Sequence, residues 1–292
     1  MSEPSPFTRV RLHGPYFIVT ALFLISLAAP LGAQNPWERL PPTPALPRPQ
    51  HSGFVPVNGI RLWYATFGHG APVILLHGGL ATSNYWGLQI AALAPHFQVI
   101  AMDSRGHGRS TWDGGPISYH LMASDVIALM DALHISQAAV VGWSDGAIIG
   151  LDLAIHHPDR LTKVFAFGAN SNVAGVRDAE GSPTFIAYLR RTREEYQQLS
   201  SAPTRFDAFH AALDKMWNTE PDFSDVQLRG IRVSTWIVDG DRDEIIKRED
   251  TDHMARLIPG AGELILPRTS HFAFLQDPKL FNLALLHFLT SE

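Results

Sequence analysis

The segment Gly142-Trp143-Ser144-Asp145-Gly146 has the spacing of a nucleophilic serine on a sharp turn. In a G-x-S-x-G turn the chain passes abruptly from a strand into a helix, and the two glycines keep side chains out of the crowded bend. The apolar segment 138–141 precedes this pattern, and residues 146–156 follow it with helical spacing. We therefore expect Ser144 to be held at the tip of a sheet.

A serine hydroxyl is a poor nucleophile at neutral pH, so a base must take its proton. The chain has 14 histidines, and His271 is the one that directly follows the last expected strand, at 263–266. The patterns around His77, His107 and His253 fit structural or surface roles. We therefore expect His271 to be the base.

An acid that orients the imidazole is expected after the preceding strand, at 232–238, where three aspartates follow one another closely. Asp243 is our choice because it lies beyond the turn at Gly240 and can fold back toward the histidine. Asp241 is the reserve candidate. Asp239 is still at the strand end, where we expect it to cap the turn.

Nucleophilic attack on a carbonyl creates an oxyanion, which backbone N–H groups can stabilise. One donor is expected from Asp145, the residue after the serine. The loop that follows the strand at 72–76 should supply the other. Gly79 is our choice there, with Leu80 in reserve.

Aromatic residues near these positions are candidates for contact with a substrate. Trp143 and Phe272, which neighbour the serine and the histidine in sequence, are predicted to bind it. The aromatic residues of a later helical region could line an acyl pocket, although residues at helical spacing more often pack among helices. These residues are Phe185, Tyr188, Phe206, Phe209 and Trp217.

Short apolar runs alternate with helical segments from residue 60 onward, which predicts βαβ units and a parallel sheet with helices on both faces. The strands lapse between about 172 and 228, where two helical stretches occur. We predict an α/β fold: a doubly wound, mostly parallel sheet of about eight strands with a helical lid inserted after the sixth strand. The expected strands are 60–67, 72–76, 97–102, 138–142, 161–167, 232–238 and 263–266, and the expected lid helices are 184–199 and 205–217.

Residues 1–33 have the features of a secretory signal peptide. Arg9 and Arg11 precede an apolar run at 16–29, which is shorter than the roughly 20 residues that span a bilayer as a helix. We expect cleavage after Ala33, a periplasmic or secreted protein and no stable membrane span after cleavage. An uncleaved membrane anchor is the alternative.

The proline-rich segment 34–52 cannot enter a helix or sheet interior, and we expect it to form an extended tether. The folded domain is predicted to occupy 53–292, with the lid at about 172–228.

The net charge of −5 and the absence of cysteine exclude several functions. A mildly acidic chain lacks the clustered cations that bind nucleic acid. Disulfides, thiolate catalysis and cysteine zinc sites need cysteine. We expect no metal and no cofactor, and we interpret His156-His157 as suited to a helix C-terminus.

Five segments in order resemble landmarks of the α/β-hydrolase superfamily over about residues 55–290. They are His77-Gly78-Gly79, Asp103–Ser110, Gly142–Gly146, Gly240–Asp243 and Ser270-His271. The nucleophile turn is similar to that of small-molecule esterases, enol-lactonases and valacyclovir-hydrolase-like enzymes. In the last group an aspartate at the position of Asp145 is linked to binding a substrate amino group. Alternatively, Asp145 complements the helix N-terminus.

The resemblance implies an acyl-enzyme mechanism in which Ser144 attacks a carbonyl, His271 moves the proton and Asp243 holds the imidazole. The expected partner is a small-molecule ester, with lactones and amino-acid esters as variants. Two alternatives remain open at this point. The chain could perform cofactor-independent haloperoxidase or lyase chemistry, or it could be a non-catalytic ligand receptor on a hydrolase fold.

Overall fold

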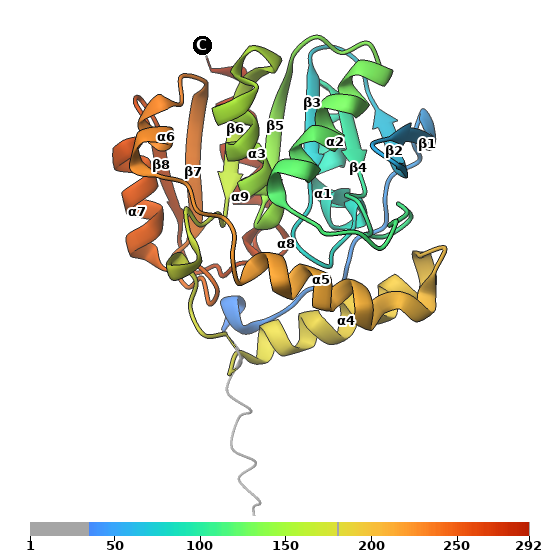
Figure 1. Ribbon diagram of the computed structural model, residues 1–292. Helices are drawn as coiled ribbons and strands as arrows, with labels where there is room; N and C mark the ends of the chain where they lie inside the picture. The colour runs from blue at the N-terminus through green and yellow to red at the C-terminus, as the bar shows by residue number, and fades with distance from the viewer. Residues whose placement is uncertain (1–34, 180, 292) are drawn as a thin grey trace, which may run out of the picture. The chain divides into compact units, whose positions relative to one another are not determined.

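The computed structural model describes residues 35–179 and 181–291, so the expected leader at 1–33 lies outside the described residues. Eight strands form one sheet in the order β1-β2-β4-β3-β5-β6-β7-β8 (Figure 1). β2 is antiparallel to both β1 and β4, and the remaining neighbours are parallel. The strands are β1 (His51–Val57), β2 (Ile60–Phe67), β3 (Pro72–Leu76), β4 (Gln98–Met102), β5 (Ala138–Trp143), β6 (Leu161–Phe167), β7 (Ser234–Gly240) and β8 (Gly262–Leu266).

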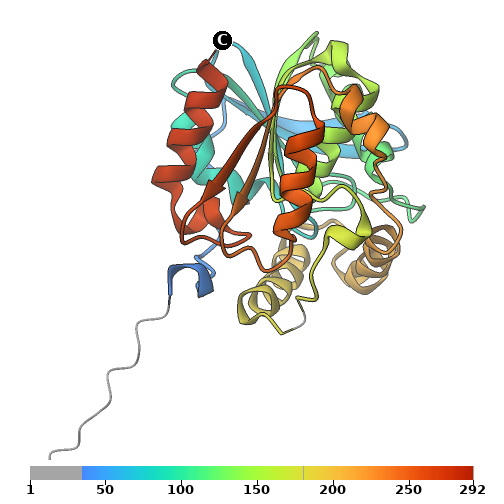
Figure 2. The same cartoon turned by 90° about the vertical axis from the view of Figure 1, so that its left-hand side faces the viewer.

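Helices cover both faces of this sheet, which confirms the predicted doubly wound fold (Figure 2). Helices α1, α8 and α9 pack on one face, and α2, α3, α6 and α7 pack on the other. Their bounds are α1 (Gly87–Leu93), α2 (Tyr119–Ala132), α3 (Asp145–His156), α6 (Asp225–Gly230), α7 (Arg248–Leu257), α8 (Ala273–Gln276) and α9 (Pro278–Thr290). No helix within the two described ranges has the length and apolarity to cross a membrane.

The central strands are apolar throughout because both of their faces are buried. In β3, Ile74 and Leu76 join the core beneath α2 and α3, whereas Val73 and Leu75 join the core beneath α1 and α9. Alternate residues of one strand therefore supply two separate cores, and this accounts for an unbroken apolar run where a half-exposed strand would alternate.

The insertion after β6 holds the two long lid helices, α4 (Pro183–Leu199) and α5 (Phe206–Trp217). They lie together along the edge of the sheet where the parallel strands end (Figure 1). Tyr188 of α4 donates a hydrogen bond to the carbonyl of Gly79, in the loop after β3. The lid predicted after the sixth strand is thus present and touches the loops at the carboxyl ends of the strands.

The described part of the proline-rich segment contains a short 3-10 helix at Pro36–Glu38, and it is fixed against the domain. Arg191 of α4 donates hydrogen bonds to the carbonyls of Leu40 and Pro41, and Thr43 bonds to Glu195 of the same helix. The expectation of a free tether ending near residue 53 therefore differs from the structure, in which β1 begins at His51. A proline residue has no backbone N–H to donate, but the backbone carbonyl groups of a proline-rich segment remain strong acceptors. An arginine of the lid can therefore bind them.

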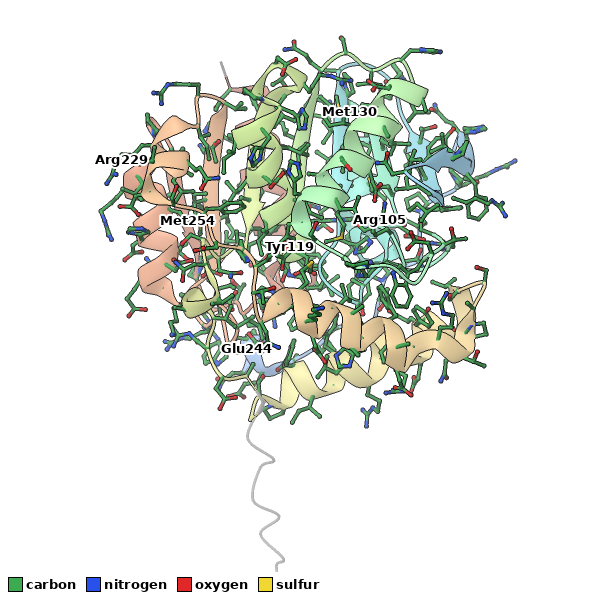
Figure 3. The ribbon with its side chains drawn as sticks, in the orientation of Figure 1. Arg105, Tyr119, Met130, Arg229, Glu244 and Met254 are labelled. Atoms are coloured by element: carbon green, nitrogen blue, oxygen red, sulfur yellow. The ribbon has the colours of Figure 1, made fainter. Side chains whose placement is uncertain are left out.

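A buried ion pair holds the turn after β4. Arg105 donates two hydrogen bonds of 2.7 Å to Asp125 of α2, and both side chains are only 1% exposed (Figure 3). Burial alone raises the pKa of Asp125 above its ordinary value, and the hydrogen bonds and charge of Arg105 oppose this shift. The pair fixes the start of the segment 103–110 against α2.

Replacing Asp125 by alanine should therefore destabilise the protein strongly, because it leaves a buried guanidinium without a counter-charge. We expect the free energy of unfolding in urea to fall by about 3–5 kcal/mol. The matched control is Asp207→Ala, which breaks an exposed pair with Arg193 and should cost about 1 kcal/mol or less. Similar losses in the two variants would contradict this assignment.

Candidate active site

Ser144 sits at the junction of β5 and α3 in a backbone conformation that L-residues rarely adopt, with φ of 55° and ψ of −120°. Its N–H donates to the carbonyl of Phe167 on the neighbouring strand at 2.9 Å, and its carbonyl accepts from Ala147 in the first turn of α3. These bonds over-determine the turn, which is how a strained φ persists in a folded protein. The side chain is half-buried.

The two glycines of this turn are required by contact between backbones. A Cβ at Gly142 would lie 2.2 Å from the carbonyl oxygen of Gly146, and a Cβ at Gly146 would lie 2.1 Å from that of Leu76. Neither position tolerates a side chain, because a backbone atom cannot move aside as a flexible side chain can. The two glycines of the G-x-S-x-G pattern are thus required because β3, β5 and α3 pass so close to one another.

His271 and Asp243 meet at the same edge of the sheet. The Nδ1 atom of His271 lies 2.7 Å from Oδ2 of Asp243, and both side chains are nearly inaccessible to solvent. The other carboxylate oxygen accepts from the backbone N–H groups of Ile245 and Ile246 at 2.7 Å each. Because Nδ1 bonds to the carboxylate, Nε2 is the ring nitrogen left to take a proton.

Gly168 provides the space for this imidazole. It follows β6 with φ of +66°, and a Cβ there would lie 2.8 Å from Cε1 of His271 and 3.0 Å from Nδ1. A side chain at this position would displace the ring from Asp243. Gly168 is a site residue that our sequence analysis missed, although a glycine directly after the strand at 161–167 was a visible signal.

Two further carboxyl groups, those of Asp239 and Glu244, lie next to the His271–Asp243 pair. Asp239 accepts from the N–H of Gly240, as a turn cap does, and from Thr251, and it also shares a hydrogen bond with Asp243. Glu244 accepts the backbone N–H of His271 at 3.1 Å (Figure 3). Sequence reasoning assigned no role to Glu244, since an acid adjacent to another acid carries no signal of which loop it will face.

The charges of this group support an ion pair. Burial lowers the pKa of His271, but the charge and hydrogen bond of Asp243, assisted by Glu244 and Asp145, outweigh it and raise the pKa above 6.5 overall. Burial raises the pKa of Asp243, and the interactions with His271 reverse this to a net lowering. Burial, and then the charge of Asp243, raise the pKa of Asp239 well above its usual range. Asp239 therefore favours its protonated form and can donate to Asp243.

Two segments near Ser144 offer backbone N–H groups for an oxyanion: the first residue of α3 and the loop after β3. Asp145 is the first residue of α3, so its N–H has no acceptor within the helix. Across the described chain, the N–H groups of Gly79 and Leu80 also donate no hydrogen bond. A Cβ at Gly79 would lie 2.5 Å from the indole of Trp217 and 2.7 Å from Oδ2 of Asp145, so this loop needs glycine beside the helix terminus.

A cavity of about 590 Å³ lies beneath the lid and opens onto these groups. Ser144, His271, Gly79 and Asp145 all contribute to its wall. Its remaining lining is largely apolar or aromatic, with carboxylates at several points. These residues include Leu80, Val173, Val176, Phe185, Tyr188, Leu189, Trp217, Ile245 and Ile246.

The Asp145 side chain connects the nucleophile turn to the lid. Oδ1 accepts from the hydroxyl of Tyr119 at 2.9 Å, and the indole N–H of Trp217 lies 3.0 and 3.1 Å from the two oxygens (Figure 3). Burial raises the pKa of Asp145 to about 6, against the hydrogen bonds from Trp217 and Tyr119. Both oxygens thus have protein partners, and the carboxylate complements the N-terminus of α3.

The other predicted residues fall in different places. Trp143 lines the cavity while remaining almost fully buried. Phe272 is fully buried, packs on Trp143 and Tyr188, and is not among the residues that line the cavity. Asp241, the reserve acid, accepts from the N–H of Thr269 and pairs with its neighbour, Arg242.

Of the lid aromatics, Phe185, Tyr188 and Trp217 line the cavity. Phe206 and Phe209 pack instead against Tyr196 in the core. The N-terminal end of α4 and the C-terminal end of α5 therefore supply the cavity wall, and helical spacing alone did not distinguish these two groups.

Residues 71–203 match the family model described as the alpha/beta hydrolase fold. The serine hydrolase BPHL of Homo sapiens is 28% identical over 247 residues, which cover 79% of this chain and 84% of the relative. The chain belongs to the α/β-hydrolase superfamily. This confirms the resemblance inferred from the sequence.

Other proteins similar to this α/β-hydrolase are named as an enol-lactonase and an esterase. It is 41% identical over 107 residues to 3-oxoadipate enol-lactonase 2 of Acinetobacter baylyi, a match that covers 36% of this chain and 40% of the relative. The structure of a thermophilic esterase from Thermogutta terrifontis superposes with a TM-score of 0.67 at 25% identity, covering 82% of this chain and 98% of that one. Such relatives are hydrolases, and the chain is a hydrolase of this fold.

Proposed function

We propose that this chain is a serine hydrolase that cleaves a small carboxylic ester through an acyl-enzyme intermediate, with lactones and amino-acid esters as variants. The observation that carries the proposal is the 2.7 Å hydrogen bond between His271 Nδ1 and Asp243 Oδ2, on the wall of the cavity that also contains Ser144. A buried carboxylate that bonds to one ring nitrogen fixes the orientation of the imidazole. The other ring nitrogen is then free to act as a base.

In the first half-reaction, Oγ of Ser144 forms a bond to the substrate carbonyl carbon while its proton passes to Nε2 of His271. The carbonyl π electrons move to oxygen, where the N–H groups of Asp145 and Gly79 stabilise the charge. When the carbonyl reforms, the bond to the leaving alkoxide breaks, and His271 returns the proton to that oxygen. The alcohol leaves, and Ser144 carries the acyl group.

Water completes the cycle by the same chemistry. His271 takes a proton from water as its oxygen bonds to the acyl carbon, and the proton then returns to Oγ of Ser144 as the acyl–serine bond breaks. Asp243 holds the ring and stabilises the imidazolium that forms in each half. The relatives are named for esters, lactones and other small molecules, which supports carbonyl substrates in general without selecting one.

The charge of the cavity favours neutral or cationic substrates. Among the described residues, the carboxylates of Asp145, Asp178, Asp214 and Glu220 line it, against the single guanidinium of Arg177. Asp145 carries a charge at neutral pH, since burial raises its pKa to only about 6. A substrate with its own carboxylate would meet repulsion inside a partly enclosed site, where charges are poorly screened.

A fluorophosphonate probe should label the purified protein, and Ser144→Ala should abolish the labelling. The phosphorus is attacked by an activated serine, so labelling reports the nucleophile independently of the natural substrate. Ser52→Ala changes an exposed serine on β1 and is expected to label as the unchanged protein does. Folded protein that remains unlabelled would support the ligand-receptor alternative.

The rate of ester hydrolysis should depend on pH through His271. The base must be neutral, and its pKa is raised above 6.5, so kcat/KM for 4-nitrophenyl butyrate should fall as pH drops through that raised value. Asp243→Asn removes the charge that raises it, which should lower the apparent pKa and reduce kcat on the order of 10³–10⁴-fold. A pH-independent rate in the unchanged protein would contradict the assignment.

Asp241→Asn is the matched control for this experiment, because Asp241 follows the same strand but bonds to the backbone of Thr269. It should retain both the rate and the pH profile. Equal losses in Asp241→Asn and Asp243→Asn would show that the loop, rather than the carboxylate on His271, matters.

The acidic cavity should discriminate between esters that differ in one charge. We expect kcat/KM for 4-nitrophenyl pentanoate to exceed that for mono-4-nitrophenyl glutarate, which replaces the terminal methyl by a carboxylate, by at least about tenfold at low salt. Asp214→Asn removes one lining charge and should narrow the gap. An equal or reversed preference would contradict a cavity selective for uncharged acyl groups.

A further inference from the structure

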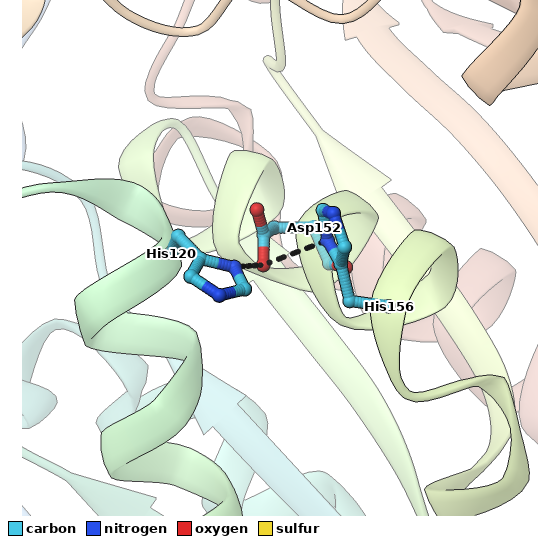
Figure 4. A group of neighbouring side chains, drawn as sticks. All are labelled: His120, Asp152 and His156. Carbon is cyan, nitrogen blue, oxygen red and sulfur yellow. Dashed lines mark hydrogen bonds and ion pairs between the residues drawn. The ribbon is translucent and has the colours of Figure 1, made fainter.

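Outside the cavity, His120, Asp152 and His156 form a cluster on the surface where α2 lies beside α3 (Figure 4). Asp152 and His156 are four residues apart on α3, so they project from the same face of that helix. His120 is the second residue of α2 and faces them from across the helix pair. Each residue offers a ligand atom, and these atoms all lie within 4.8 Å of one another.

Two of the three separations in this cluster match those between ligands of one metal ion, and the third pair of ligand atoms lies within 4.8 Å. Nδ1 of His120 lies 3.1 Å, and Nδ1 of His156 lies 3.4 Å, from the same Oδ1 atom of Asp152. With metal–ligand bonds of about 2.1 Å, neighbouring ligands lie about 3.0 Å apart in an octahedral site and about 3.4 Å apart in a tetrahedral one. Ligand spacing therefore needs little rearrangement.

The environment of Asp152 also suits a cation. The residue is only 4% exposed, and in the described ranges no lysine or arginine pairs with it, since its partners are the two imidazoles. A nearly buried carboxylate without a permanent cationic partner is costly, and a metal ion would supply that charge. The two histidines are exposed, which leaves coordination positions open to water.

Two existing contacts must change on binding. Nδ1 of His120 is hydrogen-bonded to Oδ1 of Asp152 at 3.1 Å, and the proton in that bond would have to leave for both atoms to coordinate one metal ion. Nδ1 of His156 lies 3.0 Å from the carbonyl oxygen of Asp152, and a proton on that nitrogen would have to leave for it to coordinate a metal. This change is an ordinary one, because a metal ion binds the ring nitrogen of a neutral imidazole that carries no proton.

We propose that His120, Asp152 and His156 bind one divalent transition-metal ion, for which Zn²⁺ is the probe, with water completing the coordination. Two imidazoles and one carboxylate are a ligand set that suits Zn²⁺ and Ni²⁺ better than Mg²⁺ or Ca²⁺. The ion would act structurally. Asp152 and His156 lie 8 and 12 residues after Ser144, which at 1.5 Å per residue is about 12–18 Å along the helix.

Calorimetry can test this with the purified protein carrying no polyhistidine tag, stripped with EDTA and then dialysed. Titration with ZnCl₂ should show one bound equivalent, and Zn²⁺ but not Mg²⁺ should raise the melting temperature. His120→Ala and His156→Ala should each weaken binding at least about tenfold. Zn²⁺ binding of unchanged affinity in both variants, or no saturable binding, would overturn the proposal.

The matched control is His253→Ala. His253 forms a two-residue contact with Asp225 at 3.1 Å, the same separation as in the cluster but without a third ligand. This variant should bind Zn²⁺ as the unchanged protein does, and loss of binding would overturn the assignment of the site. His120→Gln serves as a second variant if His120→Ala does not fold in EDTA.

Fluorophosphonate labelling separates this proposal from the proposed function. The cluster does not touch the reacting atoms, so EDTA should leave the labelling rate of Ser144 unchanged. Labelling that required Zn²⁺ would overturn a structural role for the ion. Failure of labelling in both states would contradict the serine-hydrolase proposal while the calorimetric result still decides the metal site.

Discussion

At the turn after β5 the backbones of three elements come as close as backbones can. The Cα of Gly146 faces the carbonyl of Leu76, and that of Gly142 faces the carbonyl of Gly146, with no room for a methyl group at either position. This contact forces Ser144 into its strained φ. It also aligns the first N–H of α3 with the loop after β3. The positions of the proposed nucleophile, of one proposed oxyanion donor and of the neighbouring loop thus follow from a single packing constraint.

The remaining groups reach the serine because parallel strands end at one edge. β6, β7 and β8 deliver Gly168, Asp243 and His271 to that edge in turn, and the glycine leaves room for the imidazole. Burial alone would neutralise both the carboxylate and the ring. Their mutual hydrogen bond reverses this, and Asp239 can assist when protonated. A chain of two carboxyl groups and one imidazole is therefore stable in a dry pocket only as a unit.

The fold was predictable from local patterns because each central strand feeds two cores and is apolar throughout. The nucleophile turn was visible for the same reason, since its glycines answer a local contact. His271 could be located by its position after the last strand. The roles of Gly168 and Glu244 depend on which loops meet in space, and spacing along the chain does not encode that. β1 was missed because Gly53 and Pro56 interrupt its pattern, as an edge strand permits.

The contacts of the lid could not be predicted from sequence patterns. Helical spacing located α4 and α5 but did not reveal that the described proline-rich segment is bound to α4 through Arg191, because such bonds use backbone carbonyls that every residue carries.

Asp145 links the proposed active site to the rest of the molecule through two separate groups, its backbone N–H and its side-chain carboxylate. Its N–H has no acceptor within α3, while its carboxylate accepts from Tyr119 on α2 and Trp217 on the lid. Any shift of α2 against α3 would therefore act on Asp145, the proposed oxyanion donor, and on the lid together. The proposed metal site joins the same two helices through His120, the neighbour of Tyr119. An ion there would join α2 to α3 at their surface without approaching the substrate or the reacting atoms.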